Sequence, residues 1–100
     1  MIGIIVALEK EVCSLLRKSE IIKEKTIAGK KFITCKLEDK NAVIAISNVG
    51  KVASAMTCQS LIYNFAPETI LNFGSVGGIK EMAKPLSIYA VEKCCQYDFD

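Results

Sequence analysis

A carboxylate follows closely on a short apolar run at the start of the chain. The run Ile2–Leu8 predicts a buried strand, and Glu11 stands just beyond it. In open α/β sheets, ligands bind outside the carboxyl ends of the strands, where a carboxylate can accept a proton from water or substrate. Glu11 is therefore the first candidate for a catalytic residue. Its position also suits a surface carboxylate at the favourable N-terminal end of a helix, which is the alternative.

A glycine-rich turn, Gly74-Ser75-Val76-Gly77-Gly78, follows a second apolar segment, residues 69–73. Glycines after a buried strand let a ligand approach free backbone N–H groups, although they also suit a plain tight turn. Their spacing differs from that of the dinucleotide, phosphate and hydrolase glycine motifs. Because the chain has no histidine, a hydrolase triad around Ser75 is excluded within these residues, and a hydrogen-bonding role remains.

A third segment, residues 42–47, ends in a bend that contains Val49. If the three segments run parallel, their carboxyl ends surround one pocket with two polar groups. The predicted pocket is lined by Ala7, Leu8, Val49, Glu11 and Ser75.

Periodicity predicts the elements that position these residues. A helix is expected over 9–18, where apolar residues recur at helical spacing. Residues 21–28, 31–37 and 42–47 predict three strands of an antiparallel meander. The third of these strands is uniformly apolar, so we expect it to be covered on both faces.

A second helix is predicted over 52–65, and Ala66-Pro67 ends it. Its apolar residues surround much of its circumference, so it needs a second covering surface, either more of the same domain or another subunit. A strand over 69–73 then completes a parallel crossover. A final strand is expected over 87–95.

Composition limits the classes of function. One hundred residues allow a single domain, and 13 basic against 11 acidic residues, with one arginine, leave no nucleic-acid footprint. Five cysteines without a C-x-x-C pair indicate reduced, packed thiols, and we expect no metal site. No apolar run approaches the ~20 residues that span a bilayer, and no signal peptide is evident. We therefore expect a cytoplasmic protein without a membrane partner.

Three segments, Ile2–Val12, Ser47–Val52 and Asn72–Ile79, together resemble the N-terminal half of the 5'-methylthioadenosine/S-adenosylhomocysteine nucleosidase family. This family is related to the purine nucleoside phosphorylases. The resemblance implies an α/β fold, a three-layer sandwich around a twisted mixed sheet, and a homodimer for which helix 50–65 is a candidate interface. Residues 1–100 are expected to form a single, apparently truncated domain.

The resemblance also implies a reaction, the hydrolysis of the N-glycosidic bond of a small nucleoside substrate in methionine salvage, without a cofactor. Methylthioadenosine or adenosylhomocysteine would yield adenine and the thioribose product. Glu11 would accept a proton from the attacking water, and Ser75 would lie near that water and the ribose. The remaining substrate-binding positions are Ala7, Leu8, Val49, Val76 and Gly77. The family's acid lies in its second half, so these residues alone are expected to be inactive.

Two other interpretations remain. A nucleoside phosphorylase of the same superfamily would need an arginine-rich phosphate site, and Arg17 is the only arginine. A non-catalytic half-domain that acts by associating with a partner chain is the second alternative.

Overall fold

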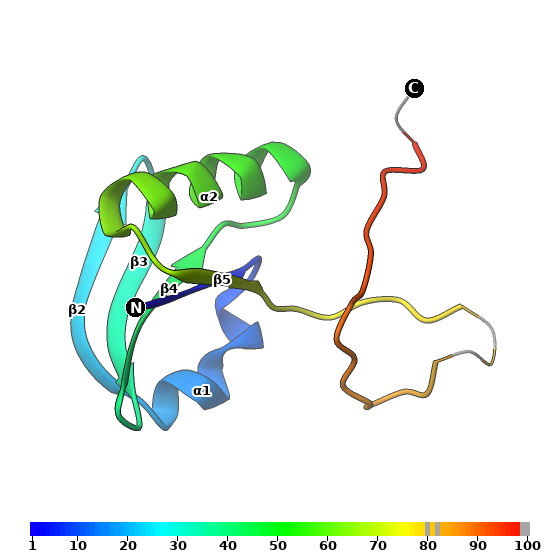
Figure 1. Cartoon of the computed structure of the whole chain (residues 1–100), viewed down its shortest axis with the longest axis horizontal. Coiled ribbons are helices and arrows are strands. Elements are labelled where there is room, and N and C mark those ends of the chain that lie inside the picture. Colours follow the sequence, from blue (N-terminus) through cyan, green and yellow to red (C-terminus); the bar gives the residue numbers. More distant parts are fainter. Residues whose placement is uncertain (80, 82, 99–100) are drawn as a thin grey trace.

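The computed structural model describes residues 1–79, 81 and 83–98, of which residues 2–72 form one mixed sheet with helices on both faces (Figure 1). The sheet order is β2-β3-β4-β1-β5. The strands are β1 (Ile2–Val6), β2 (Glu20–Ile27), β3 (Lys30–Leu37), β4 (Lys40–Ile46) and β5 (Thr69–Asn72). β2, β3 and β4 pair antiparallel, whereas β1 pairs in parallel with β4 and β5. The predicted meander and parallel crossover are confirmed, and the carboxyl ends of β4, β1 and β5 share one edge.

Two apolar clusters, one on each face of the sheet, form the core. On one face, Val12 and the helix α1 (Cys13–Arg17) pack on Ile4, Val6 and Ile44. On the other face, the helix α2 (Lys51–Phe65) packs on Ile5 and Val43 through the fully buried Leu61. Figure 1 shows the two helices on opposite sides of the sheet. The three-layer α/β sandwich is therefore confirmed.

β4 lies in the interior of the sheet, and its residues from Ala42 to Ile46 are all buried. Alternate side chains enter the two clusters, because successive residues of a strand point to opposite faces. The uniformly apolar run therefore marks a strand that is covered on both faces, as predicted.

The helix expected over 9–18 is interrupted. A single 3-10 turn, η1 (Glu9–Glu11), comes first, and α1 starts only after Val12, whose φ and ψ of −119° and 6° are not helical. The Glu11 side chain accepts the Leu8 N–H and caps η1, while Val12 at the break is buried in the core at 1% exposure. The preceding strand ends at Val6, earlier than the predicted Leu8.

α2 is confirmed within one residue of its predicted start. It ends where Ala66 adopts a left-handed φ of 46°, directly before Pro67. The helix packs closely on the sheet, because a Cβ on Gly3 would lie 2.9 Å from Leu61 Cδ2. Among the described residues, no helix has the length and apolar character needed to cross a bilayer.

The strand predicted over 87–95 is wrong. This segment has no regular secondary structure, and its apolar residues Ile88 and Val91 are largely exposed. A strand needs a neighbour to satisfy its N–H and C=O groups, and none of the described strands pairs with this segment. In Figure 1 it runs apart from the sheet.

Candidate active site

The carboxyl ends of three parallel strands hold the site together. Beyond β4, the Ser47 N–H donates to the carbonyl of Val6 at 2.9 Å, and beyond β5, the Phe73 N–H donates to the carbonyl of Ile5 at 3.0 Å. These bonds continue the ladder past the ends of the strands. They fix the chain after β4 and β5 on either side of the turn that follows β1.

Glu11 links two of these strand ends. Its Oε1 accepts the Leu8 N–H at 3.0 Å, and its Oε2 accepts both the Ser75 N–H at 3.0 Å and the Ser75 hydroxyl at 3.3 Å. The predicted pair is therefore in direct contact. The carboxylate accepts N–H groups from the start of η1 and from the glycine-rich turn, so it caps the helical turn and also contacts a second strand end.

The same bonds lower the pKa of Glu11 below its ordinary value of 4.5. The Ser75 N–H has the largest effect, followed by the Leu8 N–H, while partial burial acts in the opposite direction. Hydrogen bonds donated to a carboxylate favour its ionised form. Glu11 is therefore an anion at neutral pH and an acceptor of protons.

Gly74 permits this contact. A Cβ at this position would lie 3.1 Å from Glu11 Oε2, closer than ordinary van der Waals contact. A larger residue would push the carboxylate away from Ser75. The glycine at position 74 thus lets the backbone of the turn approach the Glu11 carboxylate closely, a contact that a plain tight turn would not require.

Glu11 lies in the wall of a cavity of about 180 Å³. This volume is below the range of about 300–1,000 Å³ that is usual for small-molecule sites. The residues that line the cavity are Ile5, Ala7, Glu11, Ser47, Asn48, Gly50, Ser54, Asn72, Phe73, Gly74 and Ser75.

The predicted binding residues separate into two groups. Ala7 lines the cavity beside Glu11 and Ser75, whereas Leu8 lines a neighbouring cavity. Val49 and Val76 are 74% and 77% exposed, and a Cβ on Gly77 would meet nothing within 4 Å. The structure therefore brings Ala7, Glu11 and Ser75 together, and the catalytic and binding roles of all seven residues remain predictions.

Four polar residues that line this cavity were not predicted as site residues from the sequence: Ser47, Asn48, Ser54 and Asn72. Asn48 has a left-handed φ of 67°, which asparagine tolerates better than most residues. An asparagine in the bend after a buried strand was the signal that could have identified it. Ser54 lies one helical turn after Gly50, whose carbonyl accepts its N–H at 3.0 Å.

The lining suits a neutral, hydroxyl-bearing ligand. Its described residues offer one carboxylate with hydroxyl, amide and backbone groups, and neither lysine nor arginine. Among the residues that the structure describes, no three histidine, cysteine, aspartate or glutamate side chains are grouped as metal ligands. The chemistry available here is proton acceptance by Glu11 beside a polar, uncharged ligand.

The sequence model of the phosphorylase superfamily matches residues 1–100. The chain belongs to the phosphorylase superfamily. Within it, the chain is 43% identical over 81 residues to a 5'-methylthioadenosine/S-adenosylhomocysteine nucleosidase of Staphylococcus aureus. That match covers 81% of this chain and 36% of the relative. The resemblance seen in the three sequence segments is thereby confirmed.

Solved structures of this superfamily share the fold. A methylthioadenosine/adenosylhomocysteine nucleosidase from Colwellia psychrerythraea, in complex with adenine, has a TM-score of 0.78 at 37% identity over 83% of this chain and 34% of that chain. The futalosine hydrolase of Helicobacter pylori has a TM-score of 0.64 at 29% identity over 71% of this chain and 31% of that chain. The chain spans about a third of the length of these relatives.

Proposed function

We propose that this chain supplies the water-activating side of a nucleosidase site that hydrolyses the N-glycosidic bond of methylthioadenosine and adenosylhomocysteine. The contact of Glu11 with Ser75 carries this proposal, because it holds an ionised carboxylate at the edge where three strand ends meet. The names of the relatives supply the substrate class.

The hydrogen bonds of Glu11 indicate where water binds. A carboxylate oxygen has two lone pairs. Among the described residues, Oε2 accepts two hydrogen bonds and Oε1 accepts one. Oε1 thus retains a lone pair for a water molecule, which Glu11 would orient toward the sugar.

The reaction then follows from the position of this base. Water forms a bond to the anomeric carbon, and the bond from that carbon to the purine nitrogen breaks with its electron pair leaving on adenine. Glu11 takes the proton of the water as positive charge on the sugar ring is discharged. Adenine needs a proton from an acid, which we expect elsewhere in the full-length protein. The 100 residues alone would then be inactive.

The charges of the site favour water over phosphate as the nucleophile. No lysine or arginine of the described residues lines the cavity, and the guanidinium of Arg17 is bonded to Cys13 and Ser14 of its own helix. A phosphorylase would need cations at this position. Hydrolysis is therefore the better supported of the two reactions.

We also propose a cytoplasmic homodimer in which α2 contributes to the interface. Four large apolar residues of α2 are exposed: Val52, Met56, Ile62 and Tyr63. Several exposed apolar side chains on one helix indicate an interaction surface, whereas single scattered ones would not need a partner.

The proposal is tested by incubating the full-length protein with methylthioadenosine in heavy-oxygen water, with and without phosphate. We expect adenine and a free thioribose that carries the heavy oxygen, at a rate independent of phosphate. A phosphate-dependent rate with a sugar phosphate as product would assign a phosphorylase instead. If no adenine is released, the proposal is wrong, and futalosine becomes the next substrate to test because of the similarity to the Helicobacter enzyme.

A further inference from the structure

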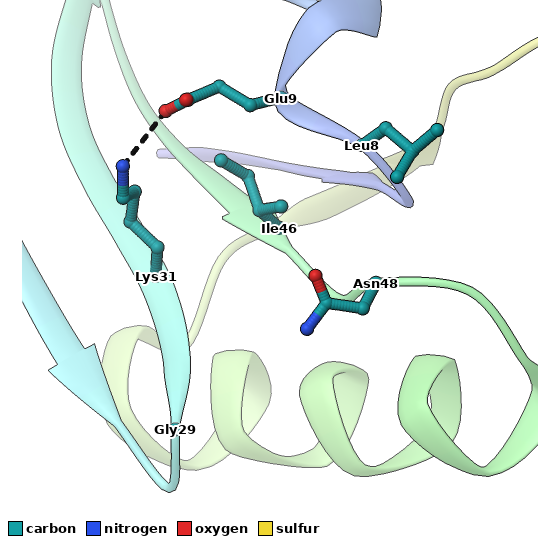
Figure 2. A pocket seen from close by; sticks show the side chains of 6 residues that line it. All are labelled: Leu8, Glu9, Gly29, Lys31, Ile46 and Asn48. Carbon is teal, nitrogen blue, oxygen red and sulfur yellow. Dashed lines mark hydrogen bonds and ion pairs between the residues drawn. The ribbon is translucent and has the colours of Figure 1, made fainter.

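A second cavity of about 260 Å³ lies beside the candidate active site. Figure 2 shows its lining: Leu8, Glu9, Gly29, Lys31, Ile46 and Asn48. Gly29, at the tip of the β2–β3 hairpin with a left-handed φ of 79°, borders it without a side chain. The mechanism proposed above uses none of the charged groups of this cavity.

One anion and one cation line this cavity. Glu9 Oε1 and Lys31 Nζ lie 2.9 Å apart, and Figure 2 shows the two side chains reaching toward each other from η1 and β3. Glu24, which does not line the cavity, contacts the same ammonium at 3.3 Å. The side chains of Lys31 and Glu9 are 39% and 53% exposed, so a ligand can reach both.

The two cavities are neighbours. Asn48 lines both of them. Leu8 lines the second cavity, while its N–H donates to Glu11 in the first. When the reacting part of a ligand lies at Glu11, a substituent of that ligand could therefore pass Asn48 and Leu8 and enter the second cavity.

The chemistry of the second cavity matches an amino-acid head on an apolar stem. Leu8 and Ile46 offer apolar surface to methylene groups, and the paired charges of Glu9 and Lys31 complement an ammonium and a carboxylate on one carbon. Such a zwitterion has no net charge, and neither does the pair.

We infer that this second cavity binds the zwitterionic amino-acid tail of a nucleoside thioether, with Lys31 on the carboxylate and Glu9 on the ammonium. The inference rests on the proposed nucleosidase function. It assigns to these residues the selectivity for adenosylhomocysteine, whose tail is charged, over methylthioadenosine, whose tail is a methyl group.

The test uses the full-length protein, the variants Lys31→Met and Glu9→Gln, and two singly charged tail analogues. One analogue is deaminated adenosylhomocysteine, with only the carboxylate, and the other is decarboxylated adenosylhomocysteine, with only the ammonium. Each kcat/KM is divided by that for methylthioadenosine in the same variant, which cancels any common effect on catalysis.

We expect Lys31→Met to lower the ratio for the carboxylate tail by about two- to fivefold and to spare the ammonium tail, as for an exposed ion pair. Glu9→Gln should do the reverse. The matched control Glu24→Gln removes an ion pair of Lys31 outside the cavity and should change neither ratio. Equal losses for both tails, or unchanged ratios in both variants, would overturn the inference.

Failure of the proposed function gives a different result. If the protein cleaves none of these compounds, the proposed reaction is wrong, and calorimetric affinities for the same analogues replace kcat/KM. Weaker binding of the carboxylate analogue by Lys31→Met and of the ammonium analogue by Glu9→Gln would still support the tail site. Affinities for both analogues that equal those of the parent protein in both variants would contradict it.

Discussion

Ser75 donates both its backbone N–H, at 3.0 Å, and its hydroxyl, at 3.3 Å, to a single oxygen of Glu11 across 64 residues of sequence. The contact joins the turn after β1 to the turn after β5. It holds the carboxylate ionised at the edge of the sheet where the parallel strands end.

Ser75→Ala removes the hydroxyl bond and keeps the bond from the backbone N–H. Because one of the three donors to Glu11 is lost, we expect kcat/KM for methylthioadenosine to fall by about three- to tenfold in the full-length protein. Steady-state assays of adenine release measure this change. A loss as large as that of a Glu11 variant would mean that Ser75 has a role beyond orienting the carboxylate.

Gly74→Ala places a methyl group 3.1 Å from Glu11 Oε2, so the carboxylate must move by a few tenths of an ångström. The bonds from Ser75 lengthen, and the pKa of Glu11 rises toward 4.5. A carbon NMR titration of the Glu11 carboxyl group measures the change. In the matched variant Gly77→Ala, whose added Cβ meets nothing within 4 Å, the pKa should stay where it is in the parent.

Folding stability should depend on pH through Glu11. Its pKa is lowered in the folded state, so its contribution is present above the ordinary value of 4.5 and is lost as pH falls through the lower, folded value. In urea unfolding at about neutral pH, the parent should have a larger free energy of unfolding than Glu11→Gln. This difference should shrink as the pH falls below the ordinary pKa of Glu11. A difference that grows on acidification would contradict the lowered pKa.

Gly3 lies directly against Leu61 of α2, since a Cβ on Gly3 would be 2.9 Å from Leu61 Cδ2. We expect Leu61→Ala to cost about 2–5 kcal/mol of unfolding free energy and Gly3→Ala to cost about 1–3 kcal/mol. The shortened Leu61 side chain makes room for the new methyl group. The double variant should therefore lose at least about 0.5 kcal/mol less unfolding free energy than the sum of the two single losses. Strictly additive losses in chemical denaturation would show that the two side chains do not compete for this space.

Much of the fold could be predicted from the sequence, because the local signals agreed with the tertiary structure. The uniformly apolar run within β4 predicted burial on both faces, and Pro67 marked the end of α2. The helix break at Val12 could not be predicted, because it depends on side-chain and core contacts rather than on spacing. The segment 87–95 has a strand-like pattern, but a pattern does not supply a pairing partner.

The candidate site was predictable only in part. Glu11 and Ser75 stand at the ends of apolar segments, and parallel pairing brings such ends together. Val49 is exposed, and its neighbours Asn48 and Gly50 both have positive φ, a bend that the spacing of apolar residues does not reveal. The cavity lined by Glu9 and Lys31 lies between η1 and β3. Its position depends on the register of the folded sheet, so the sequence did not predict it.

The most direct test of Glu11 as the water-activating base is single-turnover release of adenine from methylthioadenosine by the full-length Glu11→Gln variant. The matched control is Glu20→Gln, an exposed carboxylate at the start of β2. In the Gln variant, the amide must turn its NH2 toward either Leu8 N–H or Ser75 N–H, so circular dichroism and calorimetric substrate binding accompany the assay.

The account predicts that Glu11→Gln stays folded, binds methylthioadenosine, and releases adenine about two to four orders of magnitude more slowly than the parent, while Glu20→Gln matches the parent. A folded Glu11→Gln variant that releases adenine at the parental rate would contradict the central claim.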